Sequence, residues 1–423
     1  MPTRNSVIMT GLGFELPDKK GVCDRVDEFW DIIKNGKSNL SVTDLYPEIN
    51  VKVVGEIKTL DTASFNMPPK YERKYSRAAF IASLAVRNAM KDAGLSSEEL
   101  SNDRTLLISA SSIYALENVS KQYERYIKHG SKGVGFDYFL QGTPPSVPCA
   151  VSKLLNLDCP MMTLGGSCVT GPHALQIAYE KLNSGLIDRA IIVGVEANIT
   201  PLYLASVSYR MKNNQTINTM SQDPKSVKPH DKNLEGNACG EGGVAIILER
   251  GDIKKKAAFN TSRFKMYYSN SRKNGASLFD SGEPGNIART VKTVLKEANI
   301  CMDNVGFIND FAEGTGFIED FFCDAINDIR KELNYSDEIL LTNQEAAFGH
   351  IAGISGLVKC ISNIMMMNEG IVTPVINCKE KCERLNADPV IGEYKKKQSQ
   401  YSMFINVGAG GDCTVTLLEK VLN

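Results

Sequence analysis

The sequence predicts an α/β protein made of two fused halves around a largely buried sheet. Short runs rich in β-branched residues alternate with longer segments of helical periodicity throughout the chain, a pattern typical of this class. Residues 168–174 (CVTGPHA) and 350–356 (HIAGISG) also carry small residues at the same offsets, and each segment opens a long helix. Such residues let two helices approach closely across a pseudo-twofold axis, which indicates an internal duplication.

Length and charge limit the functions that this chain can have. Its 423 residues can bury one large core or two fused ones, and 43% hydrophobic with 23% charged residues are ordinary values for a globular protein. The 48 basic and 49 acidic side chains give a net charge of −1, which offers no reason to expect a nucleic-acid partner. These totals favour a globular enzyme.

The expected compartment is the cytoplasm. The first residues lack the apolar core and cleavage site of a signal peptide, and no stretch reaches the ~18–20 apolar residues that cross a membrane. The 11 cysteines are scattered and odd in number, as is typical of reduced thiols. Cys378 and Cys382 form an isolated C-x3-C pair. We therefore expect no metal site, no cofactor and no membrane contact.

The two predicted halves both alternate strands and helices. The first half contains a strand at 7–11, a helix at 27–34 and a helix at 75–93 that ends at Gly94. Its other strands are predicted at 105–109, 189–194 and 243–249. The lysine-rich residues 254–256 mark the boundary between an N-terminal half, 1–255, and a C-terminal half, 256–423. The second half has strands at 264–268, 305–309, 402–407 and 414–418, and helices at 287–298, after Gly316 and after His350.

Cys168 is the first candidate catalytic residue. It follows an apolar run at 161–164 and a glycine pair, and it precedes the strongly helical residues 174–182. A strand, a glycine turn and a helix in this order place the thiol at a helix N-terminus, where unpaired N–H groups and the helix dipole favour the thiolate. The alternative is a small buried cysteine in a turn that needs glycine for its shape.

Three further turns carry candidate chemistry. Glu313 lies in DFAEGTG (310–316) directly after a predicted strand, and the alternative for it is a solvated carboxylate. His350 lies in a turn of small residues before an apolar helix, where a histidine can simply cap the helix. The turn NVGAGG (406–411) can present backbone N–H groups to an anion, although such turns need glycine in any case.

The order of these segments resembles the elongating β-ketoacyl-acyl carrier protein synthases, members of the thiolase-like superfamily, over nearly the whole chain. GSCVTG (166–171) is similar to their nucleophile turn, and GHIAGISG (349–356) to their G-H-x-x-G-x-x-G turn. KPHD (228–231), GEGG (240–243) and GAGG (408–411) are similar to the R-P-F-D, G-E-G and G-F-G-G segments. The resemblance implies a thiolase-like fold of two duplicated halves in a layered α-β-α-β-α architecture.

Glu313 is the first departure from this family. The resemblance implies that Cys168, Glu313 and His350 form the catalytic set, with Glu313 where relatives carry a second histidine. Malonyl decarboxylation builds negative charge near the thioester, which an ionised glutamate repels. A carboxylate of raised pKa instead suits proton transfer at a neutral acyl α-carbon. The related 3-hydroxy-3-methylglutaryl-CoA synthases use such a Cys–Glu–His set without decarboxylation.

Two other departures concern the surroundings of the site. Relatives carry a lysine five residues before the G-H histidine and a glutamate in the next helix, whereas this chain has Glu345 and Lys359. Reversing both charges preserves a buried pair, so we expect an ion pair between Glu345 and Lys359. Ala409 replaces a phenylalanine gate. The resemblance implies an oxyanion hole made by the N–H groups of Cys168 and Ala409, and a substrate channel lined by Ala409 and Phe317.

The resemblance implies a condensing acyltransferase of specialised polyketide or fatty-acid-type biosynthesis. It would load an acyl group from acyl carrier protein or coenzyme A onto Cys168 and then form a C–C bond by a Claisen-type step, with malonyl decarboxylation altered or absent. A homodimer or a ketosynthase-type heterodimer is expected. The alternatives are acyl transfer to an oxygen or nitrogen nucleophile, thioester hydrolysis, and a partner subunit similar to the chain-length factors, which have typically lost the nucleophile.

Overall fold

One large sheet runs through the whole molecule. The computed structural model describes residues 5–136, 138, 141–209, 219–252, 262–273 and 282–421, and within them the sheet has 12 strands. The boundary predicted at residues 254–256, between halves 1–255 and 256–423, lies outside the described residues. No helix in the described part of the chain is long and apolar enough to span a membrane.

The sheet consists of two sets of strands with the same order. Their members are β1 (Val7–Pro17), β5 (Thr105–Ala110), β6 (Met161–Leu164), β7 (Arg189–Glu196) and β9 (Gly242–Arg250) in the first half, and β10 (Ser262–Arg272), β11 (Val305–Asn309), β12 (Leu340–Thr342), β16 (Tyr401–Gly408) and β17 (Asp412–Lys420) in the second. The orders are β6-β5-β7-β9-β1 and β12-β11-β16-β17-β10. In each set, taken in this order, the first two pairs are parallel and the last two are antiparallel. The predicted duplication is confirmed, and antiparallel pairing of β1 with β10 joins the copies.

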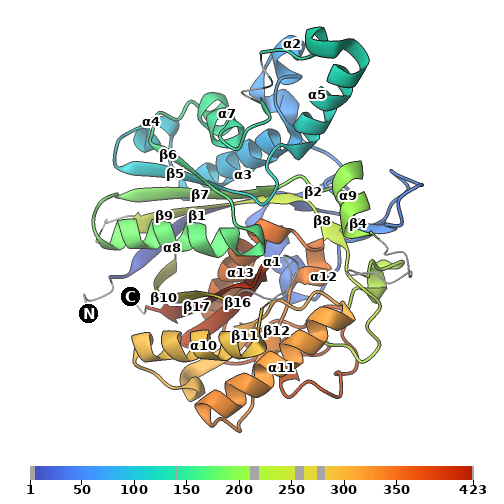
Figure 1. Ribbon diagram of the computed structural model, residues 1–423. Coiled ribbons are helices and arrows are strands. Elements are labelled where there is room, and N and C mark those ends of the chain that lie inside the picture. The colour runs from blue at the N-terminus through green and yellow to red at the C-terminus, as the bar shows by residue number, and fades with distance from the viewer. Residues whose placement is uncertain are drawn as a thin grey trace.

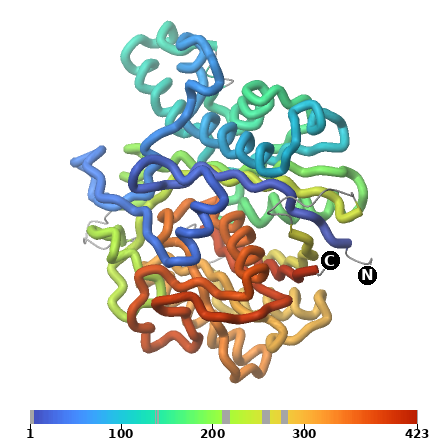
Figure 2. The backbone as a smooth tube through the Cα atoms, turned by 180° about the vertical axis from the view of Figure 1, so that it is seen from behind, coloured from blue at the N-terminus to red at the C-terminus, as the bar shows by residue number. Residues whose placement is uncertain are grey.

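Helices form three layers around the two sets of strands (Figure 1). They are α3 (Arg77–Ala93), α7 (Ser146–Leu155), α8 (Thr170–Asn183), α10 (Pro284–Ala298), α11 (Gly316–Leu333) and α13 (Ser355–Glu369). α3 and α7 cover the outer face of the first set, α10 and α11 cover that of the second, and α8 and α13 lie between the two sets. Figure 2 shows the same layers from behind. Buried apolar side chains fill the spaces between the layers, and the predicted α-β-α-β-α architecture is confirmed.

Strand β1 is longer than the sequence predicts. The predicted strand stops at Gly11, whereas β1 continues to Pro17. A Cβ atom at Gly13 would lie 1.9 Å from the carbonyl oxygen of Ala85, and one at Gly11 would lie 2.4 Å from that of Ala89. The two glycines therefore do not end the strand; they let α3 pack directly against it.

The ends of α3 are set by local capping. The helix begins at Arg77 and not at residue 75, because the side chain of Ser76 accepts a hydrogen bond from the N–H of Ala79. It ends before Gly94, as predicted, and Gly94 has a left-handed backbone with φ of 61°. The other α-helices and strands of the described chain are α1 (Val26–Lys34), α2 (Pro69–Glu72), α4 (Ser97–Leu100), α5 (Leu116–His129), α9 (Pro201–Val207), α12 (Glu345–Phe348), β2 (Val22–Cys23), β3 (Ser41–Val42), β4 (Val53–Gly55), β8 (Cys239–Gly240), β13 (Ile371–Val372), β14 (Asp388–Pro389) and β15 (Lys395–Lys396).

Candidate active site

Cys168 lies where the predicted strand, glycine turn and helix meet. β6 ends at Leu164, and a single 3-10 turn at Ser167–Val169 leads directly into α8. Ser167 has a left-handed backbone with φ of 57°, which costs a residue other than glycine about 1–3 kcal/mol. The surrounding contacts therefore hold this turn in a conformation that it would not adopt alone. The thiol is half-buried, within reach of a substrate.

The turn is fixed by the close approach of α8 to α13. A Cβ atom at Gly171 would lie 2.8 Å from the carbonyl oxygen of Gly353, and one at Gly356 would lie 2.4 Å from Cδ of Pro172. These are the small residues shared by segments 168–174 and 350–356. The predicted close contact of the two helices is confirmed, and it places the N-terminal ends of both helices side by side.

His350 is the partner of the Cys168 thiol. Its Nε2 lies 3.3 Å from Sγ of Cys168. The backbone of His350 is held from both sides, because its N–H donates to the carbonyl oxygen of Ala238 at 2.7 Å and its carbonyl oxygen accepts from the N–H of Gly240 at 3.1 Å. A Cβ atom at Gly240 would lie 2.3 Å from the carbonyl oxygen of Phe348. The GEGG segment therefore serves to seat the histidine.

Two carboxylates approach the other ring nitrogen of His350. Oε2 of Glu345 lies 3.1 Å from Nδ1, and Oε2 of Glu313 lies 3.4 Å from the same atom. The structure thus brings together all three predicted catalytic residues, with Cys168 and Glu313 on different nitrogens of one imidazole. Such a nucleophile–imidazole–carboxylate series is the arrangement that activates nucleophiles in acyl-transfer enzymes.

The predicted ion pair between Glu345 and Lys359 is not formed as a direct contact. Glu345 binds His350, and Nζ of Lys359 donates to the carbonyl oxygen of Ile405 at 3.2 Å. The reason is the path of the chain: Glu345 begins α12, and Gly349, with φ of 82°, turns His350 back toward it. Glu345 and Lys359 line one small internal cavity. Burial lowers the pKa of Lys359, and the negative charge of Glu345 limits the fall.

The charges in the site favour a protonated imidazole. Burial alone would disfavour the cation, but the negative charges of Cys168, Glu345 and Glu313 outweigh it and raise the pKa of His350 well above its usual range. Burial also raises the pKa of Glu313, and the neighbouring His350 limits this rise. The imidazole can therefore hold a proton for a leaving group while the carboxylates stabilise its charge.

The glycine-rich turn lies beside the nucleophile turn, as the resemblance implies. A Cβ atom at Gly408 would lie 3.6 Å from Cβ of Ser167. Ala409 comes next and is exposed. Phe317 is the second residue of α11, and its side chain is 56% exposed. The oxyanion-hole role of Cys168 and Ala409 and the channel role of Ala409 and Phe317 stay predictions.

Sequence reasoning missed two residues near Glu313. The side chain of Asn237 is buried, and its amide opposes the rise in the pKa of the Glu313 carboxyl. The second residue is Tyr203, on α9. Burial of its hydroxyl, followed by the nearby charges of Cys239 and Cys168, raises the pKa of this group well above the usual value. Asn237 precedes the GEGG segment by three residues, so the family-like segment pointed to the region but not to this side chain.

Glu196 links the two halves beneath the site and was also missed. It ends strand β7 and is fully buried. Its Oε1 accepts hydrogen bonds from the N–H of Ser112 at 2.6 Å and from the N–H of Gly353 at 3.1 Å. Burial raises its pKa to about 7, although these hydrogen bonds oppose the rise. Its position at a strand end, where ligand sites of α/β sheets form, was the available signal.

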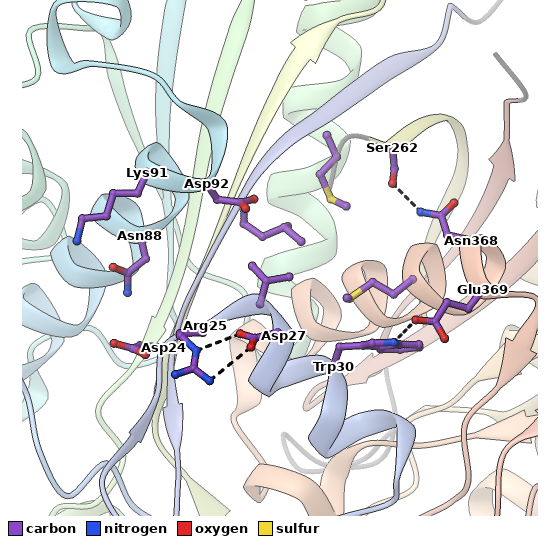
Figure 3. Close-up of a pocket in the computed structure, with 14 residues that line it drawn as sticks. Asp24, Arg25, Asp27, Trp30, Asn88, Lys91, Asp92, Ser262, Asn368 and Glu369 are labelled. Atoms are coloured by element: carbon purple, nitrogen blue, oxygen red, sulfur yellow. Dashed lines mark hydrogen bonds and ion pairs between the residues drawn. The ribbon is translucent and has the colours of Figure 1, made fainter. Parts of the chain in front are cut away.

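A cavity of about 820 Å³ lies away from these residues, between α1, α3 and α13 (Figure 3). Asp92 and Lys91 line it from α3, and Trp30 from α1 forms a hydrogen bond with Glu369 there. None of the predicted site residues lines it. Among the described residues, no group of three or more His, Cys, Asp or Glu side chains could hold a metal ion.

Known proteins resemble this chain in sequence and in fold. Relatives match along almost their entire length: the 3-oxoacyl-[acyl-carrier-protein] synthase 2 of Vibrio harveyi is 23% identical over 427 residues, covering 99% of each chain. The tetracenomycin polyketide synthase ketoacyl synthase alpha subunit of Streptomyces glaucescens is 21% identical, over 98% of this chain and 97% of that protein.

Solved structures show the same fold. The ishigamide ketosynthase/chain length factor superposes with a TM-score of 0.84 at 18% identity, over 99% of this chain and all of that chain. A ketosynthase solved with its type II polyketide synthase acyl-carrier protein gives a TM-score of 0.81 at 20% identity, over 99% of this chain and 100% of that chain. The sequence also matches the family models of the beta-ketoacyl synthase N-terminal domain at residues 4–253 and C-terminal domain at residues 264–379. The chain belongs to the β-ketoacyl synthase family.

Proposed function

We propose that this protein is a condensing enzyme of polyketide or fatty-acid-type biosynthesis that works through an acyl-cysteine at Cys168. The observation that carries the proposal is the contact of 3.3 Å between Sγ of Cys168 and Nε2 of His350, with two carboxylates at Nδ1 of the same ring. A thiol, an imidazole and a carboxylate in series are the groups that thioester exchange requires. The family supports acyl thioesters as the substrates.

The first step is acyl loading. The thiolate of Cys168 attacks the carbonyl carbon of an acyl thioester, and a new S–C bond forms. The bond between that carbon and the donor sulfur breaks, and the departing thiolate takes the proton from Nε2 of His350. Because the pKa of His350 is raised, its imidazole still carries this proton at neutral pH. The N–H groups of Cys168 and Ala409 would stabilise the oxyanion between these events.

The second step is Claisen-type condensation. His350, neutral after loading, removes a proton from the α-carbon of a second thioester. The released electron pair forms a C–C bond with the acyl carbonyl carbon, and the S–C bond to Cys168 breaks. The thiolate of Cys168 is thereby regenerated beside a protonated His350, so the cycle closes without a co-reactant. Glu313, whose pKa is raised by burial, helps to carry protons between the ring and the substrate.

The donor and the assembly follow from the family. Relatives named as acyl-carrier-protein synthases, and a neighbour solved with an acyl-carrier protein, support acyl carrier protein as the carrier of the thioester, although coenzyme A offers the same chemistry. Relatives also support a homodimer or a ketosynthase-type heterodimer. Glu313 in place of a histidine supports an α-carbon donor that does not lose CO2 by the usual route, because a carboxylate repels malonyl.

The test of the acyl-enzyme is the mass of the intact protein after incubation with an acyl thioester. A mass increase equal to one acyl group is expected, and Cys168→Ala should abolish it. A chain-length-factor-like subunit would show no such adduct, although the contact between Cys168 and His350 argues against that role. Products separate the remaining alternatives: a new C–C bond supports condensation, an ester or amide supports transfer to oxygen or nitrogen, and a free acid supports hydrolysis.

The test of the altered chemistry uses radiolabelled malonyl thioester. Release of CO2 should be slow, and Glu313→Gln should change it because the substitution removes the carboxylate charge near the site. Rapid release of CO2 that is the same in both proteins would contradict a special role for Glu313 and would assign this chain the ordinary decarboxylating reaction.

A further inference from the structure

A second histidine, His230, lies completely buried behind the active site. Its Nε2 lies 2.9 Å from Oδ2 of Asp310, and its Nδ1 lies 2.8 Å from Oε1 of Glu319. Its backbone N–H donates to Oε2 of Glu319 at 3.1 Å, and its ring packs against Phe322. The carboxylates of Asp310 and Glu319 are as buried as the ring itself. None of these side chains takes part in the steps proposed above.

The ring of His230 carries a proton on each nitrogen. A neutral imidazole has a single N–H, so one of its nitrogens would face a carboxylate with a lone pair. Both nitrogens lie at hydrogen-bond distance from carboxyl oxygens, and with both carboxyls ionised only the imidazolium satisfies both. Burial opposes the charge, but Asp310 and Glu319 outweigh it and raise the pKa of His230 well above its usual range. The cluster is therefore a cation between two anions. Without the cation, the two buried carboxylates would have no compensating charge.

Asp310 connects this cluster to the peptide that carries Glu313. Its second oxygen, Oδ1, accepts hydrogen bonds from the N–H of Ala312 at 2.8 Å and from Nδ2 of Asn343 at 2.8 Å. Nδ2 of Asn343 also donates to the carbonyl oxygen of Ala312 at 2.8 Å. Ala312 directly precedes Glu313, and both of its backbone polar groups are held by this network.

Asn343 extends the network to the other carboxylate. Its Oδ1 accepts a hydrogen bond from the N–H of Glu345 at 2.9 Å. Asp310 and Asn343 are the first residues after β11 and β12, which pair in parallel, so the two strand ends lie at one edge of the sheet. Both carboxylates at Nδ1 of His350 are thus tied through their backbones to one buried hub.

We propose that His230, Asp310 and Asn343 form a buried network that positions Glu313 and Glu345 against His350. The three are positioning residues, since none contacts Cys168 or its substrate side. The proposal deepens the proposed function, on which it rests only for the use made of the two carboxylates. His230 stands where the R-P-F-D segment of relatives has phenylalanine, and Glu313 stands where they have histidine, so the hub and the carboxylate that it holds depart from the family together.

The test is the rate at which iodoacetamide alkylates Cys168 at different pH values, followed by mass spectrometry of the peptide that contains it. This readout needs no substrate, so it is independent of the reaction catalysed. Displaced carboxylates stabilise the protonated His350 less, so less imidazolium lies beside Sγ of Cys168 below neutral pH and alkylation should slow. His230→Phe should therefore lower the alkylation rate at pH 6 by about tenfold, which is the effect of a fall of one unit in the pKa of His350.

A matched control separates positioning from general stability. Phe322→Leu removes packing from the ring of His230 but removes no hydrogen bond or charge of the network, and it should leave alkylation at pH 6 within about twofold of the unchanged protein, whatever stability it loses. If Phe322→Leu slows alkylation as much as His230→Phe does, the effect is structural and the proposal is overturned.

Two double variants keep the test decisive if His230→Phe does not fold. In that background Asp310→Asn removes one of the two uncompensated charges but keeps an oxygen that accepts from Ala312 and Asn343, so the alkylation profile should return toward that of the unchanged protein. Asp310→Ala removes the charge and the acceptor, and the tenfold loss at pH 6 should remain. Equal rates in the two double variants would overturn the proposal. A failure of the acyl-enzyme test alone would leave these rates unaffected and would count against the proposed function only.

Discussion

Glu345 and Glu313 lie 3.1 and 3.4 Å from the same atom, Nδ1 of His350. Two carboxylates so close to one N–H repel each other. A charged ring offsets this repulsion, and a proton on one of the carboxylates removes it. They differ in access, because the side chain of Glu345 is 5% exposed and that of Glu313 is 14% exposed. We therefore expect Glu345 to orient the ring and Glu313 to meet a molecule that enters from solvent.

Glu345→Gln should slow acyl loading more than Glu313→Gln does. Both remove a charge that raises the pKa of His350, so in each the pKa falls and less imidazolium is present near neutral pH. The loss at pH 7 should be about 10- to 100-fold for Glu345→Gln, and it should shrink at acidic pH, where the ring is protonated in every variant. The rate of adduct formation against pH measures this. Equal losses, independent of pH, would contradict the assignment of separate tasks.

Glu196→Gln should make the folded protein more resistant to high pH. The pKa of Glu196 is about 7 in the folded chain against 4.5 for the ordinary group, so between these values the folded state keeps a proton that the unfolded state has released. Its contribution to stability falls as pH rises through this window, by about 3 kcal/mol in all. Glutamine keeps the acceptor for Ser112 and Gly353 and does not titrate. Denaturant unfolding at pH 5 and pH 8 should show a smaller difference for the variant than for the unchanged protein.

Gly356→Ala should destabilise the junction of α8 and α13. The added Cβ would lie 2.4 Å from Cδ of Pro172, a ring that cannot swing aside, and overpacking of this kind costs about 1–3 kcal/mol. Gly316→Ala is the matched control, because nothing lies within 4 Å of its Cβ position at the start of α11. Thermal melting of both variants measures the difference. Similar melting temperatures would mean that the two helices can move apart at little cost.

Ala409→Phe should narrow the range of acyl groups that load onto Cys168. Ala409 is exposed and follows Gly408, which packs against Ser167, so a large side chain there can be accommodated without entering the core. Loading of bulky acyl thioesters should fall at least tenfold relative to acetyl, by the steric exclusion that discriminates substrates by size. Ala409→Ser is the control for a small change. Unchanged loading of both classes would show that the approach to the thiol lies elsewhere.

Much of the fold could be predicted, because its signals are local. Strand β11 and the C-terminal end of α3 depend on a short apolar run and on Gly94, and both lie where the sequence indicates. The extent of β1 could not be predicted in this way. Gly11 and Gly13 resemble breaks in a strand until the helix that packs on them is known, and that helix comes from residues about seventy positions later.

The candidate site, like the fold, could be predicted where its residues stand in local motifs and not where they meet only in the folded chain. Cys168, His350 and Glu313 each stand in a recognisable turn, and the structure brings them together. The partner of Glu345 could not be inferred from charge reversal alone, because the turn at Gly349 brings His350 nearer to it than Lys359. His230, Asp310 and Asn343 meet from three distant segments with no shared motif, so only the folded chain reveals them.

The repeated strand order has a consequence for how this enzyme could have arisen. In each copy a short turn leads into a long helix, and the two helices, α8 and α13, contact each other at glycines in matching positions. One copy carries the sulfur nucleophile, and the equivalent turn of the other carries the imidazole that serves it. Two identical units would carry the same residue in both turns. In one chain the two turns can differ, so the first copy supplies the nucleophile and the buried imidazolium of His230, and the second copy supplies His350 with its two carboxylates.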